Sequence, residues 1–598
     1  MNSTFEVAPE RENLTDKRNF WAAICLLPLA AFLTYLPVLK AGFTNWDDPL
    51  FVLDNLYIRS FNPVSLKWIF TGLLGNWAPV TWLSYSLDYR LGGLDPFWFH
   101  LQNLVLHCAA TVLVFLLVRQ IGEVAALPDK SGKPATKVYP FQTIAWIAAL
   151  LFGVHPLHVE NVAWITDRID LLCAVFSLAS LLFYLKQNAG SPKPRTSFTL
   201  SLGFYGLALM SKSNAVTLPL VLVLLDVWPL RKPWNGWGSL LKEKAVFLLP
   251  ALAVGAATIL ARQQLNSVAS LMLVPMDYRV MNAFHSLFFY PWKMLAPLEL
   301  CPLYPMLQGS TYSGPYILSL VGGVALTVFC AKTWKRSPEY SVAWGFYLIT
   351  LLPTLGLVSV GSQAAADRYA YLPSLVPFIL VALMLNRLLP TKRLFLTVLV
   401  IGLSAGLAWG ARQQARYWKD SISLWEHELQ YYPINYPSAY SCLGDAYREA
   451  GNLDGALKLY DIALKGFHQL AFLHNGRGAV LLEMGRNEEA VQSFQDALAA
   501  SAPGDDQAGL AHAHLDILYK RMGKVDLARK ERELAISSAP TNAWQHFDLG
   551  ERYLKYGLPE QALAQYRLAA EIYPWYAEAQ AKLDGIPSVK DQKTGRSP

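Results

Sequence analysis

Two adjacent acidic residues, Asp47 and Asp48, follow the first long apolar run of the sequence, which covers about residues 20–39. Ionised carboxylates close to a membrane boundary are costly unless they have partners or a function. Repulsion between neighbouring carboxylates raises the pKa of one of them, which can then take the proton of an attacking hydroxyl group. The simpler alternative is that Asp47-Asp48-Pro49 only forms a turn.

A second set of polar residues stands at the ends of later apolar runs. Its basic side chains suit phosphate, because a guanidinium group matches phosphate with two parallel hydrogen bonds. Histidines would add further hydrogen-bond donors. We therefore expect a phosphate site made from Arg168, Lys212, Arg368, His155 and His158, supported by Glu160, Asp167, Asp170, Asp367 and Tyr369.

Each basic residue also has a purely structural interpretation. Arg168 lies between Asp167 and Asp170 in the sequence, so an ion pair with them is as good an explanation as a ligand contact. Arg368 also follows an aspartate. Lys212 would otherwise only extend its ammonium group toward the membrane surface. The sequence leaves these alternatives open.

The histidines do not form a recognisable metal motif. His155, His158 and Glu160 are close in sequence, but their spacing lacks the helix register of a zinc site and no cysteine joins them. The 6 cysteines show no CxxC spacing and are expected to be packing residues. We therefore expect no metal at this site.

The composition predicts a membrane protein with a second, soluble part. The chain has 598 residues, of which 53% are hydrophobic and 16% charged, whereas soluble proteins carry about 25% charged residues. Residues 20–410 contain nearly all the long apolar runs, and residues 411–598 resemble a soluble chain. The net charge of +7 reflects basic loops and not a nucleic-acid surface.

A spanning helix needs about 20 apolar residues. We expect eleven spans and an interrupted run at 280–297 that is re-entrant or interfacial, because the loops rich in Lys and Arg then all lie on the cytoplasmic side. This arrangement predicts an uncleaved anchor after a cytoplasmic segment 1–19, and a C-terminal domain outside the inner membrane. The expected spans cover about 20–39, 98–119, 141–157, 169–186, 197–211, 213–229, 244–262, 315–332, 340–358, 370–389 and 393–410.

From residue 437 the sequence repeats with a period of 34, the length of a tetratricopeptide unit of two antiparallel helices. We predict an all-α protein: a polytopic helical bundle at 20–410, a linker with a partial repeat at 411–436, a repeat α-solenoid at 437–586, and a disordered tail at 587–598. The positions Gly444, Gly451, Ala456 and Tyr460 recur as Gly478, Gly485, Ala490 and Phe494, then less regularly in a third copy, and again as Gly550, Gly557, Ala562 and Tyr566.

These motifs together resemble the transmembrane and tetratricopeptide-repeat protein O-mannosyltransferases and their bacterial relatives. The resemblance covers most of the chain, about 20–580, including the repeats. It implies a glycosyltransferase of the GT-C superfamily. The motifs are Asn45-Trp46-Asp47-Asp48, Pro79–Tyr85 with Asp88-Tyr89, Phe99–His107, His155–Asp170, Ser211–Asn214 with Leu225–Pro229, and Asp367–Pro373.

The resemblance implies transfer of mannose or another hexose from a polyprenyl-phosphate donor, a substrate and not a cofactor, to an acceptor outside the cytoplasm. It favours Asp47 as the general base, with Asp48 positioning it or the acceptor, and attack opposite the phosphate would invert the anomeric carbon. The repeats would present a protein or peptide hydroxyl. Two alternatives remain: transfer to a cell-envelope glycan or lipid, and a non-catalytic membrane scaffold.

Overall fold

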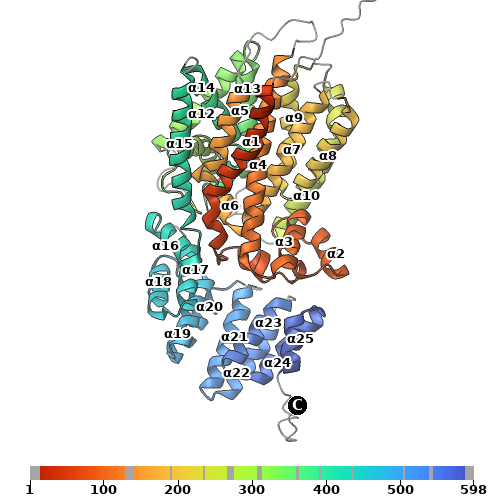
Figure 1. Ribbon diagram of the computed structural model, residues 1–598. Helices are drawn as coiled ribbons and strands as arrows, with labels where there is room; N and C mark the ends of the chain where they lie inside the picture. The colour runs from red at the N-terminus through yellow and green to blue at the C-terminus, as the bar shows by residue number, and fades with distance from the viewer. Residues whose placement is uncertain are drawn as a thin grey trace, which may run out of the picture. The chain divides into compact units, whose positions relative to one another are not determined.

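The chain forms two compact units in a computed structural model (Figure 1). The membrane unit holds the chain up to Phe43 and Phe61–Asp420, and the repeat unit holds Thr44–Ser60 and the chain from Ser421. The structure describes residues 14–127, 141–188, 192–232, 236–264, 275–305, 313–357, 363–388, 392–433, 436–502, 505–537 and 543–585. Three lysines of the loops that we expect on the cytoplasmic side, Lys130, Lys133 and Lys137, lie outside these residues, and so does the predicted tail.

The described part of the membrane unit is helical and contains no strand, only an isolated bridge between Tyr304 and Ala365. Many helices begin with proline, which fixes φ and lacks the N–H that the first turn cannot pair. The helices are α1 (Leu14–Tyr35), α2 (Pro63–Thr71), α3 (Pro79–Gly92), α4 (Pro96–Ala126), α5 (Phe141–Val154), α6 (Val159–Ala163), α7 (Arg168–Asn188), α8 (Pro194–Leu209), α9 (Leu218–Val227), α10 (Trp237–Gln264), α11 (Met276–Leu295), α12 (Gly314–Thr333), α13 (Pro338–Leu351), α14 (Leu375–Leu388) and α15 (Arg393–Ala415).

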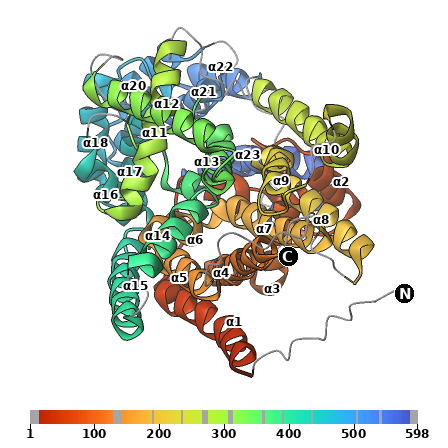
Figure 2. The ribbon, with the colours of Figure 1, turned by 90° about the horizontal axis from the view of Figure 1, so that it is seen from above.

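The longest helix, α4, packs against α1, α5 and α7, which surround it when the molecule is seen from above (Figure 2). Asp95 caps its first turn by accepting a hydrogen bond from the Phe97 amide at 3.0 Å. Apolar side chains such as Leu104, Val114 and Phe115 are fully buried along it. The helix therefore forms the centre of this part of the bundle.

A multi-pass membrane protein is confirmed, but the predicted number of eleven spans is not. Among the described residues, 6 helices are long and apolar enough to cross a membrane, or up to 7 if a helix pair bent by 54° at residue 155 counts as one span. The stretches at 213–227 and 375–388 are apolar but shorter. The interrupted run at 280–297 lies mostly within a continuous helix, α11, with Pro291 inside it, and whether it crosses stays a prediction.

Short helical segments join the long helices on the side that carries the predicted polar residues. Between α5 and α7 the chain forms three short segments: η4 (Pro156–His158), α6 and η5 (Ile165–Asp167). Two further segments, η6 (Ser213–Thr217) and η8 (Asp367–Ala370), precede α9 and α14. These breaks place polar side chains at the helix ends instead of along apolar helix faces.

The predicted repeats are confirmed as antiparallel helix pairs, seen in cyan to blue in Figure 1. The helix that precedes them lies within the predicted partial repeat at 411–436. The elements are α16 (Ser421–Tyr431), then the pairs α17 (Pro437–Glu449) and α18 (Leu453–Gly466), α19 (Ala471–Glu483) and α20 (Asn487–Ala500), α21 (Asp506–Arg521) and α22 (Val525–Ser537), and α23 (Ala543–Lys555) and α24 (Pro559–Ile572), followed by α25 (Ala577–Gly585).

Glycine allows the two helices of a repeat to approach closely. A Cβ atom added at Gly444 would lie 2.7 Å from the ring of Tyr460, and one added at Gly478 would lie 2.7 Å from the ring of Phe494. Each first helix ends at a glycine with positive φ, for example 82° at Gly451, a backbone conformation that terminates the helix. The recurring glycines and aromatics therefore fix both the packing and the turn.

The third repeat uses an ion pair where the others use glycine and an aromatic ring. Asp516 is fully buried and accepts two hydrogen bonds of 3.0 Å from the guanidinium group of Arg532. Tyr553 also donates to Asp516 at 2.8 Å. This substitution explains why the third copy looks irregular in the sequence.

Residues 44–60, which we call the anchor segment, fold as part of the repeat unit. The sequence predicted this stretch as an outer loop of the membrane domain. Its first part contacts α16 and α17 through Asn45, and its last part packs on α23, α24 and α25 through Leu56. The acidic pair is therefore carried by the unit that contains the repeats.

The close helix contact gives a testable prediction for the repeat unit. Replacing Gly444 with Ala should lower the free energy of unfolding of this unit by about 1–3 kcal/mol, since the new methyl group overlaps the Tyr460 ring. Replacing Gly466 with Ala is the matched control, because a Cβ at this position would meet nothing within 4 Å. This change should leave the free energy of unfolding unchanged or raise it. Hydrogen exchange of the α17–α19 amides in the full chain measures both. Equal exchange in the two variants would contradict the proposed packing.

Candidate functional site

Three of the polar residues predicted from the sequence, Asp170, Arg368 and Tyr369, line a small pocket in the membrane unit. The pocket has a volume of about 40 Å³ and lies at the ends of α7, α9 and α13, beside η8. Its lining includes Asp170, Asn214, Arg368 and Tyr369, together with apolar side chains. Residues that are far apart in the sequence thus come together at one site.

Asp170, which lines the pocket, forms an ion pair with Lys212. The Lys212 ammonium group lies 2.5 Å from Oδ2 of Asp170. Burial alone would lower the pKa of Lys212, but Asp170 and Asp167 together raise it above its usual value. The lysine therefore stays charged, and the alternative that it only extends to the membrane surface does not describe its contacts.

Arg368 also lines the pocket, and its guanidinium group pairs with Glu160, which lies outside the lining. Nη1 of Arg368 lies 2.5 Å from Oε1 of Glu160, and the Arg368 amide donates to Oε2 at 2.8 Å. The guanidinium carbon lies 5.3 Å from the centre of the Trp164 ring and 4.9 Å from that of Tyr369. One carboxylate thus fixes both the side chain and the backbone at the start of η8, and the predicted alternative partner Asp367 is not the one observed.

Asp367 pairs instead with a tyrosine that the sequence analysis did not identify. The Tyr304 hydroxyl donates to Oδ1 of Asp367 at 2.9 Å. Burial and the charge of Glu160 raise the pKa of Asp367 well above its usual value, although Tyr304, Lys293 and Arg368 act against this rise. The interruption of the apolar run by Lys293 was the only sequence signal for this neighbourhood.

Asp167 is buried and accepts a hydrogen bond of 2.7 Å from the Asn161 amide group. The same amide group donates to the backbone oxygen of Arg368 at 3.3 Å. Asn161 thereby links η5, which contains Asp167, to η8, which contains Arg368. Both residues support the pocket from outside its lining.

Arg168 does not line the polar pocket. Its side chain is fully buried and pairs with Asp88 of α3 instead of the neighbouring Asp167 or Asp170. Its Nε donates to Asn103 at 2.7 Å and its Nη2 to the backbone oxygen of Phe99 at 2.6 Å. Through these contacts Arg168 connects α3, α4 and α7. They do not support its predicted role in binding phosphate, which stays a prediction.

Both predicted histidines have partners at each ring nitrogen. His155 accepts from the Leu157 amide at 3.1 Å and contacts the backbone oxygen of Met294 at 2.9 Å. His158 contacts the backbone oxygen of Phe152 at 2.9 Å and the Ser374 hydroxyl at 3.1 Å. Both side chains are buried, so in this structure they hold the bend between α5 and α6.

Among the described residues, no group of three or more His, Cys, Asp or Glu side chains is arranged to hold a metal ion. The carboxylates of the pocket are directed toward Lys212, Arg368 and Tyr304. These contacts are those of an ion-pair network with a polar opening.

Asp47 and Asp48 lie in the anchor segment of the repeat unit. Asp48 is buried, and its Oδ2 accepts hydrogen bonds from the amide and hydroxyl of Thr44 at 2.8 and 3.0 Å. This is the turn that the sequence analysis gave as the simpler alternative. Asp47 is only partly buried. The turn holds Asp48 in place and leaves Asp47 the more accessible of the two.

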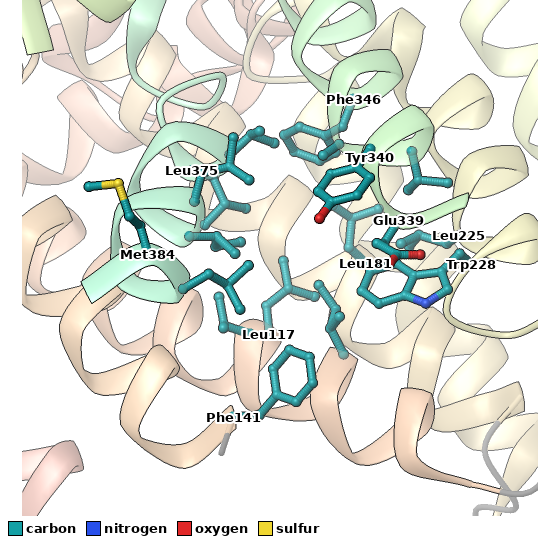
Figure 3. A pocket seen from close by; sticks show the side chains of 18 of the residues that line it. Leu117, Phe141, Leu181, Leu225, Trp228, Glu339, Tyr340, Phe346, Leu375 and Met384 are labelled. Carbon is teal, nitrogen blue, oxygen red and sulfur yellow. The ribbon is translucent and has the colours of Figure 1, made fainter. Parts of the chain in front are cut away.

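A separate apolar cavity of about 330 Å³ lies further along the same helices as the polar pocket. On α7 the lining passes from Ser177 at the polar pocket to Leu181 in the cavity, and on α13 it passes from Thr350 to Phe346. On α9 Leu218 lines the pocket and Leu225 lines the cavity. At the start of α14 Pro373 lines the pocket and Leu375 lines the cavity. In Figure 3, Leu375 and Met384 line one side, Leu117 and Phe141 the base, and Leu225, Trp228, Glu339 and Tyr340 the opposite side.

No family model matches the chain, but several curated proteins are similar to it. Protein O-mannosyl-transferase Tmtc3 of Drosophila melanogaster is 26% identical over 570 residues, which cover 83% of this chain and 57% of that protein. Protein O-mannosyl-transferase TMTC1 of Homo sapiens is 26% identical over 522 residues, which cover 77% and 56%. The chain thus spans a little more than half the length of these relatives, and the predicted resemblance is confirmed.

A shorter region is more similar. Protein O-mannosyl-transferase Tmtc1 of Drosophila melanogaster is 34% identical over 206 residues, which cover 33% of this chain and 22% of that protein. Among solved structures, a chain of the crystal structure of the APC/C hetero-tetramer Cut9-Hcn1 is 16% identical and covers 85% of this chain, with a TM-score of 0.24.

The buried pair of Arg168 and Asp88 gives a prediction about stability. Replacing Asp88 with Ala leaves the guanidinium group buried without its carboxylate and should lower the free energy of unfolding by about 3–5 kcal/mol. The control is Glu123→Ala, which breaks an exposed pair with Arg119 on α4 and should cost less than about 1 kcal/mol. Thermal unfolding of the full chain in detergent compares them, and a stable Asp88→Ala variant would refute the bracing role.

Proposed function

We propose that this chain is a membrane glycosyltransferase that moves mannose or another hexose from a polyprenyl-phosphate donor to a hydroxyl group of a protein or peptide. The observation that carries the proposal is that the polar pocket and the apolar cavity are lined by the same helices, α7, α9 and α13, and by the chain at α14. A donor of this kind has a charged phosphate and a long apolar chain. The similarity to protein O-mannosyl-transferases supports the same reaction class.

In this proposal the phosphate group binds at Lys212 and Arg368. Arg368 lines the pocket and pairs with Glu160. Lys212 pairs with Asp170, which also lines the pocket. A phosphate oxygen would share the remaining hydrogen-bond capacity of these cations. Arg168, His155 and His158 would then act at one remove, because their observed contacts hold the helices that frame the site.

The apolar chain of the donor would lie in the cavity along α14. Nearly all its lining residues are apolar or aromatic, and Glu339 and Arg387 are the charged ones among the 20 that line it. An isoprenoid chain buries apolar surface there at a gain of about 25 cal/mol per Å². The cavity thus supports a lipid-linked donor over a soluble nucleotide sugar.

The acceptor hydroxyl needs a base, and we assign this role to Asp47 on the family resemblance. The acceptor oxygen forms a bond to the anomeric carbon while the bond from that carbon to the phosphate oxygen breaks. The acceptor proton passes to the Asp47 carboxylate, and the polyprenyl phosphate leaves with the bonding electrons. Attack from the face opposite the phosphate inverts the anomeric carbon, and Asp48, held by Thr44, would fix the loop.

The repeats would bind the acceptor, because stacked helix pairs form an extended surface suited to a peptide chain. We place the site outside the cytoplasm, in the inner membrane, with a cytoplasmic N-terminus, as the basic loops predicted. A tag fused to the C-terminus should then be accessible to a protease added on the extracytoplasmic side of the inner membrane, and a tag protected inside the cytoplasm would contradict this orientation.

Replacing Asp47 with Asn tests the proposed base. The variant should keep its fold and lose transfer by about 100-fold to 10,000-fold, which is the usual contribution of a positioned acid or base. Asp95→Asn is the matched control, because Asn caps α4 as well as Asp does and activity should stay unchanged. The assay follows a hexose-sized mass increment on envelope proteins. Full activity in the Asp47 variant would remove the assignment, and an increment found only on a glycan or lipid would favour the alternative acceptor.

Narrowing the apolar cavity tests the lipid-linked donor. Leu383 of α14 lines the cavity, so Leu383→Trp should raise the KM for long-chain polyprenyl-phosphate sugars by about tenfold, since a buried ring displaces the chain. A donor with a short chain should be affected little. Leu385 lies on the same helix outside the lining and Leu385→Trp serves as the control. Equal effects on long and short donors would contradict the assigned path.

A further inference from the structure

We infer that the repeat unit positions the acidic pair, with Asn45 and Trp425 as the positioning residues. The inference rests on the proposed function, because it assigns a purpose to holding Asp47. Asn45 lies two residues before Asp47 and is bound by groups from α16 and α17. The repeats would therefore contribute to the chemical step as well as to acceptor binding.

Asn45 is fixed by its backbone and by both ends of its side chain. Its amide donates to the Ser421 hydroxyl at 2.9 Å, and its Nδ2 donates to the backbone oxygen of Cys442 at 2.7 Å. The indole Nε1 of Trp425 donates to Oδ1 of Asn45 at 2.8 Å. An amide side chain with partners at both polar atoms has one allowed orientation, so the following residues start from a fixed point.

Aromatic packing strengthens this contact. Trp425 is fully buried, and its ring lies 5.5 Å from the ring of Trp46 at an angle of 72°. This edge-to-face arrangement is favourable for two indole rings. Trp46 is the residue immediately before Asp47, so the anchor acts on the direct neighbour of the proposed base.

The other end of the anchor segment is held by the last repeats. Leu56 packs in a buried cluster with Ala543, Ala569 and Tyr573, and the ring of Tyr57 lies 5.5 Å from that of Tyr573. Arg59 pairs with Glu578 of α25 and donates to the backbone oxygen of Leu53 at 2.6 Å. The segment is therefore tied to the repeat array at both of its ends.

This double attachment limits how far the repeat array can open. Residues 45–56 span at most about 3.5 Å per residue, and the helical turn at 49–53 shortens this reach. The first and last helix pairs of the array thus stay within reach of a single short segment. A change in repeat curvature on binding a partner would pull on the residues next to Asp47.

The test replaces Trp425 with Phe, which keeps the ring and removes the N–H group that binds Asn45. Hydrogen exchange of amides 44–48 in the full chain should become about tenfold faster, because a buried acceptor loses its donor. Turnover should fall by about tenfold with the KM for the acceptor unchanged, since the proposed base is displaced while the repeats still bind. Trp77→Phe is the control: it also removes an indole hydrogen bond, to the backbone oxygen of Phe70 at 2.8 Å, and should change neither quantity.

Each outcome decides between the steps of the inference. Unchanged exchange at 44–48 would overturn the anchoring, and faster exchange with wild-type turnover would overturn the positioning role. If Trp425→Phe fails to fold, Asn45→Ala removes the same contact from the anchor segment and carries the same expectations. A wild-type protein that transfers no sugar would refute the proposed function, whereas the exchange measurement would still report on the anchor alone.

Discussion

The membrane unit depends on the rule that a charge taken out of water must have a partner. Glu160 finds two partners in Arg368: it pairs with the guanidinium group and accepts a hydrogen bond from the backbone amide. The bond ties α6 to η8, and Lys212 with Asp170 ties η6 to α7 in the same way. The helix breaks between α5 and α7 exist around these pairs. One member of each pair, Asp170 and Arg368, lines the polar pocket.

Much of the fold could be predicted because its signals are local and periodic. Apolar runs predict long helices, and glycines recurring every 34 residues predict the helix pairs. The third repeat was less clear, since Asp516 and Arg532 replace a glycine and an aromatic ring, and their pairing shows only in three dimensions. The anchor segment could not be predicted to join the repeats, because Asn45 finds Ser421 at a distance of 376 residues along the chain.

The residue types of the site could be predicted, but their pairings could not. An ion pair of Arg168 with Asp167 or Asp170 was as good an interpretation of the sequence as a ligand contact, yet residues one or two positions apart on a helix do not face each other. The direction of α7 turns Arg168 toward Asp88 and Asn103, and Asp170 toward Lys212. Tyr304 was missed altogether, because nothing in its sequence neighbourhood distinguishes a hydroxyl that binds Asp367 from one at a membrane surface.

The pairing of each cation with a carboxylate has a consequence for the proposed reaction. In the proposed complex the donor phosphate is a diester with one negative charge, and it would share Lys212 and Arg368 with Asp170 and Glu160. As the bond to the sugar breaks, the phosphate gains a second charge, so its attraction to the same cations grows. Interactions that strengthen only as charge develops lower the barrier, whereas equal strengthening of the bound donor would not. Under the proposed reaction, partly neutralised cations would thus bind the donor weakly and the departing phosphate more strongly.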